Sequence, residues 1–479
     1  MNKSMVHYLL SKLLLIEASL MLIPVIVAFI YHEDMRVINS LVITIGMLVI
    51  IGLLGVAFKP KNYHVYTKEG LLIVALCWIL WSFFGALPFV LSGQIPSIID
   101  AFFEMVSGFT TTGATIVPDV AVLSHSLLFW RSFTHLIGGM GVLVFALAIM
   151  ENSKNSHLEV MRAEVPGPVF GKVVSKLKET AQILYVIYLS MFAILVVILM
   201  IAGMPAFDSV ITAMGCAGTG GFGVYNDSIA HYNSSLITNI VSIAVLLFGI
   251  NFNLYYFLLL RKFKAFFKDE ELRTYIGIVV IATALIWLNV SGLYPSTGKA
   301  LENSLFEVAN VMTTTGFGVT DLTVWPLFAQ VILLFLMFVG GSAGSTAGGI
   351  KVMRTLILTK IARNQVLSTL YPHRIMTIHI NEQPLDKEIQ HGVLKYLTLY
   401  VFLLLGLTLM LSLDNNNFMV VVSAATSTFN NIGPMLGTSQ TFAIFSPFSK
   451  LLMSFAMIAG RLEIYPMLLL FIPKTWSKY

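Results

Sequence analysis

Apolar stretches of about 20 residues recur along the whole of this 479-residue chain and restrict it to a small set of folds. A helix needs about 20 apolar residues to cross the roughly 30 Å of hydrocarbon in a bilayer. Only 11% of the residues are charged, which excludes an ordinary soluble domain. The stretches predict membrane spans near residues 5–30, 38–58, 71–92, 124–150, 182–203, 236–260, 275–293, 327–359, 393–413 and 448–472.

The Lys and Arg residues divide sharply among the connections between these stretches. They are numerous in 59–70, 151–181, 261–274 and 351–395, whereas 93–123, 204–235, 294–326 and 414–447 contain only Lys299. Connections rich in Lys and Arg remain in the cytoplasm. We therefore expect the second set to face outside and both chain termini to be cytoplasmic, and we interpret the first apolar stretch as a span and not as a cleaved signal.

Each outside connection contains a short apolar segment followed by small and hydroxylated residues. Segments of about ten residues are too short to span and indicate re-entrant helices. Four copies indicate an internal repeat of span, short helix, loop and span. The predicted fold is an all-α polytopic membrane protein with four pseudosymmetric repeats around a central pore. Its expected divisions are 1–69 for two extra N-terminal spans and 70–150, 151–260, 261–360 and 361–479 for the repeats.

The four loops are candidates for an ion filter. Backbone that is not helical at membrane depth must line water or be buried in protein. Glycine permits backbone conformations in which successive carbonyl oxygens point inward and replace the hydration shell of a cation. The loops contain no carboxylate, which favours potassium over Ca²⁺ or Mg²⁺. The predicted potassium-binding residues are Thr111, Thr112, Gly113, Thr219, Gly220, Gly221, Thr314, Thr315, Gly316, Asn431, Ile432 and Gly433.

Beyond these loops, the chain resembles the Trk/Ktr/HKT superfamily of potassium transporters along nearly its whole length. The stretches that carry the resemblance are Arg162 to Pro168, Gly340 to Lys351 and Gly460-Arg461-Leu462-Glu463. The two extra N-terminal spans and the ending Pro473-Lys474-Thr475-Trp476 make it similar to the TrkH-type members. Two loops depart from the usual pattern, with Gly218 in place of a hydroxyl residue in the second and Asn430 and Asn431 in place of threonines in the fourth.

The resemblance implies gated potassium uptake across a bacterial cytoplasmic membrane by a homodimer in which each protomer has its own pore. It also implies control by a cytoplasmic nucleotide-binding ring called TrkA. We expect no cofactor in this chain, because nothing in it indicates a nucleotide site, and potassium is the transported ion. The basic residues form no single patch, so nucleic acid is not expected as a partner. The basic connections are either a surface for the ring or topology signals that bind anionic membrane lipid.

A glycine-rich run in the middle of an apolar stretch is the predicted gate. A regular helix is not expected there, because each glycine costs about 1 kcal/mol relative to alanine. We interpret the run as a mobile loop that blocks the pore below the filter, with close helix packing through small residues as the alternative. The gate residues are Gly340, Gly341, Ser342, Ala343, Gly344, Ser345, Thr346, Ala347, Gly348 and Gly349.

Arg461 is the second part of the predicted gate, because an Arg within a span is a functional candidate by default. The resemblance implies that it faces the pore beneath the filter. The alternative is a local pair with Glu463 or with a carbonyl group at a helix end.

Two other functions remain open. Coupled symport with sodium or protons would need buried acidic groups, for which Glu104 and Glu307 are the candidates. An intramembrane serine hydrolase would use Ser342, in a G-x-S-x-G match, with His135 as its base. A helical membrane protein lacks the strand-to-helix turn of that motif, so we do not expect an enzyme.

Overall fold

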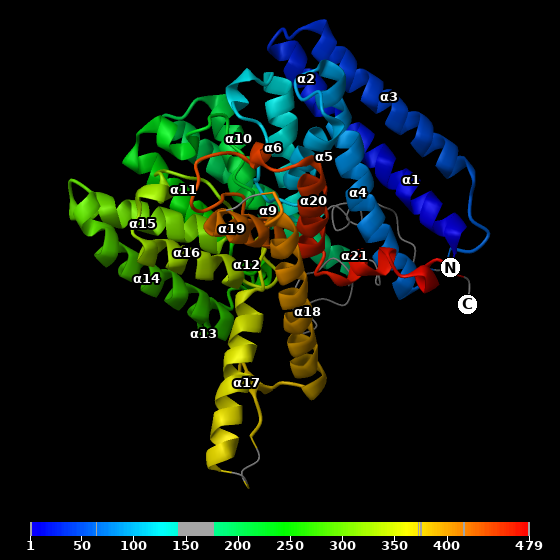
Figure 1. Ribbon diagram of the computed structural model, residues 1–479. Helices are drawn as coiled ribbons and strands as arrows, with labels where there is room; N and C mark the ends of the chain where they lie inside the picture. The colour runs from blue at the N-terminus through cyan, green and yellow to red at the C-terminus, as the bar shows by residue number, and fades with distance from the viewer. Residues whose placement is uncertain are drawn as a thin grey trace.

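The computed structural model describes residues 2–63, 65–141, 177–371, 373, 376–414 and 417–477. Within them the chain folds as a helical, multi-pass membrane protein, which confirms the predicted class (Figure 1). Six helices are long and apolar enough to cross a bilayer among the described residues, and a seventh span is added if the bent pair Ser235–Phe248 and Phe252–Leu259 is counted as one. The helices in the described ranges that are long and apolar enough to cross a bilayer are Lys3–Ile30, Met35–Ala57, Lys68–Ser92, Ala181–Ile201, Glu270–Leu293 and Lys387–Leu411.

The N-terminal helices form a peripheral hairpin, drawn in dark blue in Figure 1. It consists of α1 (Lys3–Leu20), α2 (Leu22–Ile30) and α3 (Met35–Ala57). A small residue allows the two long helices to approach closely, because a Cβ built on Gly55 would lie 1.8 Å from the hydroxyl of Ser11. Both α1 and α3 also contact α4 (Thr67–Ser92), which connects the hairpin to the rest of the molecule.

The remaining helices include four buried helices of 12 to 16 residues, each preceded by a longer helix. The predicted divisions between the repeats stay a prediction. In chain order the helices are α4 (Thr67–Ser92), α5 (Ile98–Phe109) and α6 (His125–Gly139); α9 (Leu177–Ile201), α10 (Ala206–Gly218), α11 (Ser235–Phe248), α12 (Phe252–Leu259) and α13 (Phe263–Lys268); α14 (Glu270–Val290), α15 (Thr297–Met312), α16 (Leu327–Val339) and α17 (Val352–Leu370); and α18 (Lys387–Leu411), α19 (Phe418–Asn430), α20 (Pro447–Arg461) and α21 (Tyr465–Leu470).

The short helices α5, α10, α15 and α19 begin at defined residues and are buried over most of their length. The side chains of Ser97, Ser296 and Asn417 accept hydrogen bonds from the first-turn amides of α5, α15 and α19. Around α5, the rings of Trp81 and Trp130 pack against Phe109 at centroid distances of 5.6 and 6.0 Å. The short helices therefore form the interior of the molecule, while the long helices expose large apolar side chains on their outer faces.

The stretches 236–260, 327–359 and 448–472 are each broken. The glycine-rich run at 340–349 predicted the break in the second stretch, but the predictions of continuous spans at 236–260 and 448–472 were wrong. The first bends by 90° between α11 and α12. The second is interrupted between α16 and α17, and the third between α20 and α21. Glycines at such breaks touch the ends of the short helices: a Cβ on Gly460 would lie 1.9 Å from the carbonyl oxygen of Phe429. Hydropathy averaged over 20 residues does not detect the first and third of these breaks.

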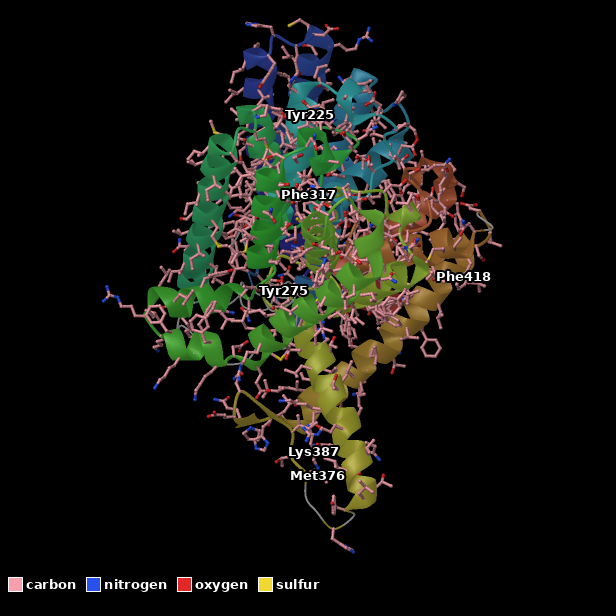
Figure 2. All side chains as sticks on the ribbon, turned by 90° about the vertical axis from the view of Figure 1, so that its left-hand side faces the viewer. Tyr225, Tyr275, Phe317, Met376, Lys387 and Phe418 are labelled. Carbon is pink, nitrogen blue, oxygen red and sulfur yellow. The ribbon has the colours of Figure 1, made fainter. Side chains whose placement is uncertain are left out.

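Helix α17 and the beginning of α18 project from the helical body at the bottom of Figure 1. Figure 2 places Met376 and Lys387 near the end of this projection. The two helices are joined through an antiparallel pair, β1 (His379–Ile380) with β2 (Gln383–Pro384), in which His379 pairs with Pro384. The described residues also form short 3₁₀ helices, which are η1 (Val120–Val122), η2 (Ser228–Tyr232), η3 (Ser291–Leu293), η4 (Leu322–Val324), η5 (Phe442–Ile444) and η6 (Pro473–Thr475).

Candidate functional site

The same backbone turn follows each of the four short helices. A residue in the left-handed region is followed by an amide that donates to the carbonyl five residues back at 2.8 or 2.9 Å, as in a Schellman motif. A non-glycine residue in that region is strained by about 1–2 kcal/mol. A glycine with positive φ comes next. The left-handed residues are Thr111, Thr219, Thr314 and Asn431, with φ of 54°, 52°, 55° and 58°, and the glycines are Gly113, Gly221, Gly316 and Gly433, with φ of 79°, 74°, 83° and 106°.

The four loops meet around one centre. A Cβ built on each of these glycines would collide with a carbonyl oxygen of the next loop. No side chain fits at these positions, and the contacts close on themselves, so the loops form a ring. The built Cβ would lie 2.0 Å from Gly220 O at Gly113, 2.1 Å from Thr315 O at Gly221, 2.1 Å from Ile432 O at Gly316 and 2.7 Å from Thr112 O at Gly433.

Hydroxyl pairs support the first and third loops of this ring. The hydroxyls of Thr110 and Thr112 lie 2.7 Å apart, and those of Thr313 and Thr315 are also 2.7 Å apart. These loops are opposite each other in the cyclic order of the contacts. Their equivalent hydrogen bonds hold the two threonine strings in the same conformation.

The second loop is supported by an imidazole in place of hydroxyls. A Cβ on Gly218 would lie 2.2 Å from the carbonyl oxygen of His135, and one on Gly220 would lie 2.5 Å from the His135 ring. The ring is held by a 2.7 Å hydrogen bond between its Nδ1 and the carbonyl of Gly108, and it stacks on Phe222 at 4.2 Å. This packing explains why the second loop has Gly218 where a hydroxyl residue is usual.

Asparagine side chains support the fourth loop. Asn431 donates through its Nδ2 to the hydroxyl of Thr112 and to the carbonyl of Met457, both at 2.9 Å. The hydroxyl of Tyr400 donates to Oδ1 of Asn430 at 2.9 Å. The amide of Asn431 therefore connects the fourth loop directly to the first.

A cavity of about 590 Å³ adjoins the ring on the side of the outside connections. Its lining includes the four central glycines and, farther out, Tyr225, which Figure 2 shows above Phe317. The carboxylates of Asp227 and Asp321 line it together with the side chain of Glu307 and the guanidinium of Arg131, whose charge is balanced by Glu104. Hydrogen bonds from the hydroxyl and the amide of Thr323 lower the pKa of Asp321. The cavity thus presents net negative charge, which attracts cations.

Glu104 and Arg131 form a buried ion pair beside the cavity, at 2.6 Å. Glu104 also accepts hydrogen bonds from Thr115 Oγ1 at 2.8 Å and from the amide of Ile116 at 2.9 Å, beyond the first loop. The guanidinium lies 3.3 Å from the ring centroid of Phe222, beside the second loop. Sequence reasoning missed Arg131, although an Arg inside a predicted span was a sufficient signal.

The predicted gate segment, residues 340–349, touches the ring from its other side, and none of its residues lines the cavity. The amide of Gly348 donates to the hydroxyl of Thr314 at 2.6 Å. A Cβ on Gly348 would lie 2.2 Å from the carbonyl oxygen of Asn430. The segment is an irregular loop between α16 and α17 and not a helix packed through small residues.

Arg461 connects this loop to the end of α6. Its guanidinium donates to the carbonyls of Thr346, Gly138 and Gly139, each at 2.6 Å. Glu463 instead pairs with Arg354 at 2.5 Å. Of the alternatives that the sequence left open for Arg461, the structure shows the contact with helix-end carbonyls.

The remaining predicted residues do not form a catalytic group. The Nδ1 of His135 forms a hydrogen bond with the carbonyl of Gly108, and the hydroxyl of Ser342 has no hydrogen-bond partner among the described residues. The part of the chain that the structure describes contains no cluster of three or more His, Cys, Asp or Glu side chains suited to a metal. The stretch from Arg162 to Pro168 lies outside the described residues, as does most of the basic connection 151–181.

Comparisons with known proteins agree over the whole chain. A family model described as a cation transport protein, TrkH, matches residues 35–478. The chain is 33% identical over 476 residues to the Trk system potassium uptake protein TrkH of Salmonella typhimurium, covering 97% of this chain and 98% of that protein. It is 31% identical over 467 residues to the Trk system potassium uptake protein TrkG of Escherichia coli K12, covering 95% and 96%. The crystal structure of the potassium transporter TrkH from Vibrio parahaemolyticus matches with a TM-score of 0.89 at 31% identity, covering 100% of both chains.

Proposed function

The chain belongs to the TrkH family of cation transport proteins, and from that premise we propose how its ring of loops performs potassium uptake. The observation that carries the proposal is the closed set of contacts between each central glycine and a carbonyl of the next loop. Such a ring presents backbone oxygens to a central axis, where they replace the hydration shell of a monovalent cation. The family and the relatives are transporters, so no catalytic step is required.

The short helices contribute to the same function. The C-terminal ends of α5, α10, α15 and α19 all lead directly into the ring. Each helix end carries about half a negative charge. Four such ends favour a cation at the centre, and the carboxylates of the outer cavity raise its local concentration. The inside-negative membrane potential then supplies about 2.3 kcal/mol per charge per 100 mV for uptake.

Residues 340–349 act as the gate in this proposal. Their contacts with Thr314 and Asn430 support a position across the inner side of the ring. Arg461 holds the loop there through Thr346 and adds positive charge below the filter. Opening requires the loop to leave the ring, and with it the hydrogen bonds of Arg461 must break.

The partners follow from the projection of α17 and α18. We propose that this basic, projecting region meets a cytoplasmic nucleotide-binding ring of the TrkA type, so that any response to nucleotide belongs to the partner. The protein is proposed to be a homodimer in a bacterial inner membrane with both termini in the cytoplasm, in contact with membrane lipid. No cofactor is proposed for this chain. Purification with and without a co-expressed ring protein, followed by measurement of the mass of the complex, tests both the homodimer and the binding of the ring.

Flux in liposomes tests the proposed function. Purified protein should carry potassium faster than sodium when a negative interior potential is imposed. Passive conduction predicts that potassium stops accumulating at its electrochemical equilibrium, whereas symport with sodium or protons predicts accumulation beyond it. Equal flux of the two cations in the intact protein would contradict a potassium-selective ring.

A further inference from the structure

The segment formed by α12 and α13, residues 252–268, runs across the direction of the span that precedes it. Helix α12 is turned by 90° from α11. Figure 1 shows α13 beside the lower end of α14, toward the side from which α17 projects. A helix turned in this way can lie along a membrane surface instead of crossing it. The segment lies on the side that the basic connections share.

The surface of this segment combines exposed apolar and basic side chains. Leu259 and Phe267 are each 67% exposed and Phe263 is 56% exposed. Exposed basic residues lie between them, namely Arg261, Lys262, Lys264 and Lys268. Apolar rings interleaved with cations are the pattern of helices that lie in the headgroup region of a bilayer. In water the two phenylalanine rings would be costly to expose.

We propose that the α12–α13 segment docks on anionic phospholipid headgroups and that this docking holds the gate loop against the ring. The four basic side chains supply the charge complementarity, since each basic group near an anionic surface strengthens partitioning about fivefold, or about 1 kcal/mol. The phenylalanine and leucine side chains supply the insertion into the acyl boundary. The occupant is the lipid surface, and a protein partner on the same face is an outcome of the test.

The segment is joined to the gate loop before and after its basic surface. Hydrogen bonds to the gate loop are made on the N-terminal side of the basic surface, at the turn between α11 and α12, and on its C-terminal side, at the start of α14. A displacement of the segment therefore pulls on the gate loop from both sides. The bonds run from the amide of Ser342 to the carbonyl of Gly249 at 3.0 Å, from the amide of Phe252 to the carbonyl of Gly344 at 3.1 Å and from the amide of Ala343 to the carboxylate of Glu271 at 2.6 Å. The same carboxylate also accepts from the amide of Met353, at the start of α17, at 3.0 Å.

The first experiment measures docking without transport. A nitroxide attached to Phe267→Cys is placed in vesicles of phosphatidylcholine alone or with one quarter phosphatidylglycerol, and its accessibility to oxygen and to a water-soluble nickel complex is compared. The native Cys77 and Cys216 are buried and give a low background. The control is Val366→Cys on the projecting α17, which is 64% exposed. We expect the label at position 267, but not at 366, to move into the oxygen-rich acyl region with phosphatidylglycerol. A label that stays aqueous in both vesicles overturns the docking.

The second experiment measures basal potassium flux in the same vesicles and rests on the proposed gate. Phosphatidylglycerol should lower the flux of the intact protein several-fold. The variant Lys262→Gln/Lys264→Gln/Lys268→Gln should lose this response, because three removed charges weaken docking up to about a hundredfold. The control variant, Lys3→Gln/Lys59→Gln/Lys61→Gln, removes the same charge near the N-terminal hairpin and should respond like the intact protein.

The outcomes separate the docking from the function. Equal flux of the intact protein in both vesicles, with the label docked, overturns the coupling to the gate. A response that is lost in both triple variants also overturns it, because it then reflects surface charge in general. An aqueous label combined with a flux change that requires a purified cytoplasmic partner identifies a protein contact and overturns lipid docking. Absence of potassium flux in every vesicle contradicts the proposed function, while the label still decides the docking.

Discussion

Replacing Glu104 by Gln should destabilise the protein strongly, because it leaves a buried guanidinium without its counter-ion. The side chains of Glu104 and Arg131 are 0% and 2% exposed, and Nε lies 2.6 Å from the carboxylate. Removing one partner of a buried pair costs about 3–5 kcal/mol. An amide oxygen at position 104 still accepts from Arg131 Nε, so part of the interaction remains in the variant. We therefore expect a loss near the lower end, about 3 kcal/mol.

The assay heats purified protein in detergent and measures the fraction that remains monodisperse at each temperature. The matched control is Glu307→Gln. Glu307 lies nine residues before Gly316, just as Glu104 lies nine residues before Gly113. Glu307 accepts from the amide of Val319 at 3.1 Å, and a Gln oxygen retains that bond, so its loss should stay within about 1 kcal/mol. The double variant Glu104→Gln/Arg131→Met should recover part of the stability. Equal losses in the two single variants would refute this account of the pair.

Three further substitutions test the gate, the hydrolase alternative and the second loop. Arg461→Ala should raise basal potassium flux several-fold in liposomes, because the gate loop loses its hydrogen bond at Thr346. Arg461→Lys should not restore the flux of the intact protein, since an ammonium group lacks the planar fork of a guanidinium. Unchanged flux in the Ala variant would count against the anchoring role of Arg461. Ser342→Ala should leave flux within about twofold, since its hydroxyl has no partner among the described residues, and loss of a hydrolytic turnover in that variant would favour the enzyme alternative. Gly218→Ser should lower the unfolding temperature, because its Cβ would lie 2.2 Å from the His135 carbonyl; an unchanged or higher temperature would show that the site can accept a hydroxyl.

The sequence predicted the class of fold and the four loops for a clear physical reason. Membrane spans and short re-entrant helices are local features of hydropathy, and strings such as Thr110 to Gly113 are local features of composition. The breaks at Gly249 and Gly460 were missed, because they depend on how closely another backbone approaches. In the structure, a Cβ on Gly249 would lie 2.7 Å from the Thr313 side chain.

The parts of the site that depend on contacts between distant residues were not predictable from one sequence. Spacing along the chain does not say which loop follows which around the ring, so the contact of Gly433 with the first loop came only from the structure. The same holds for His135, which fills the space left by Gly218. Glu104 was noticed as a buried acid, but its partner Arg131 lies 27 residues away on another helix.

The most direct test of the filter is the ratio of potassium to sodium flux in liposomes for two alanine variants of the third loop. Gly316 has φ of 83°, and a Cβ there would lie 2.1 Å from the carbonyl of Ile432, whereas a Cβ on Gly318 would have no neighbour within 4 Å. Gly316→Ala should reduce the preference for potassium or abolish flux, because the carbonyl ring must open to admit a methyl group. Gly318→Ala should keep the ratio of the intact protein. An unchanged ratio and rate in Gly316→Ala would contradict the claim that this ring selects the ion.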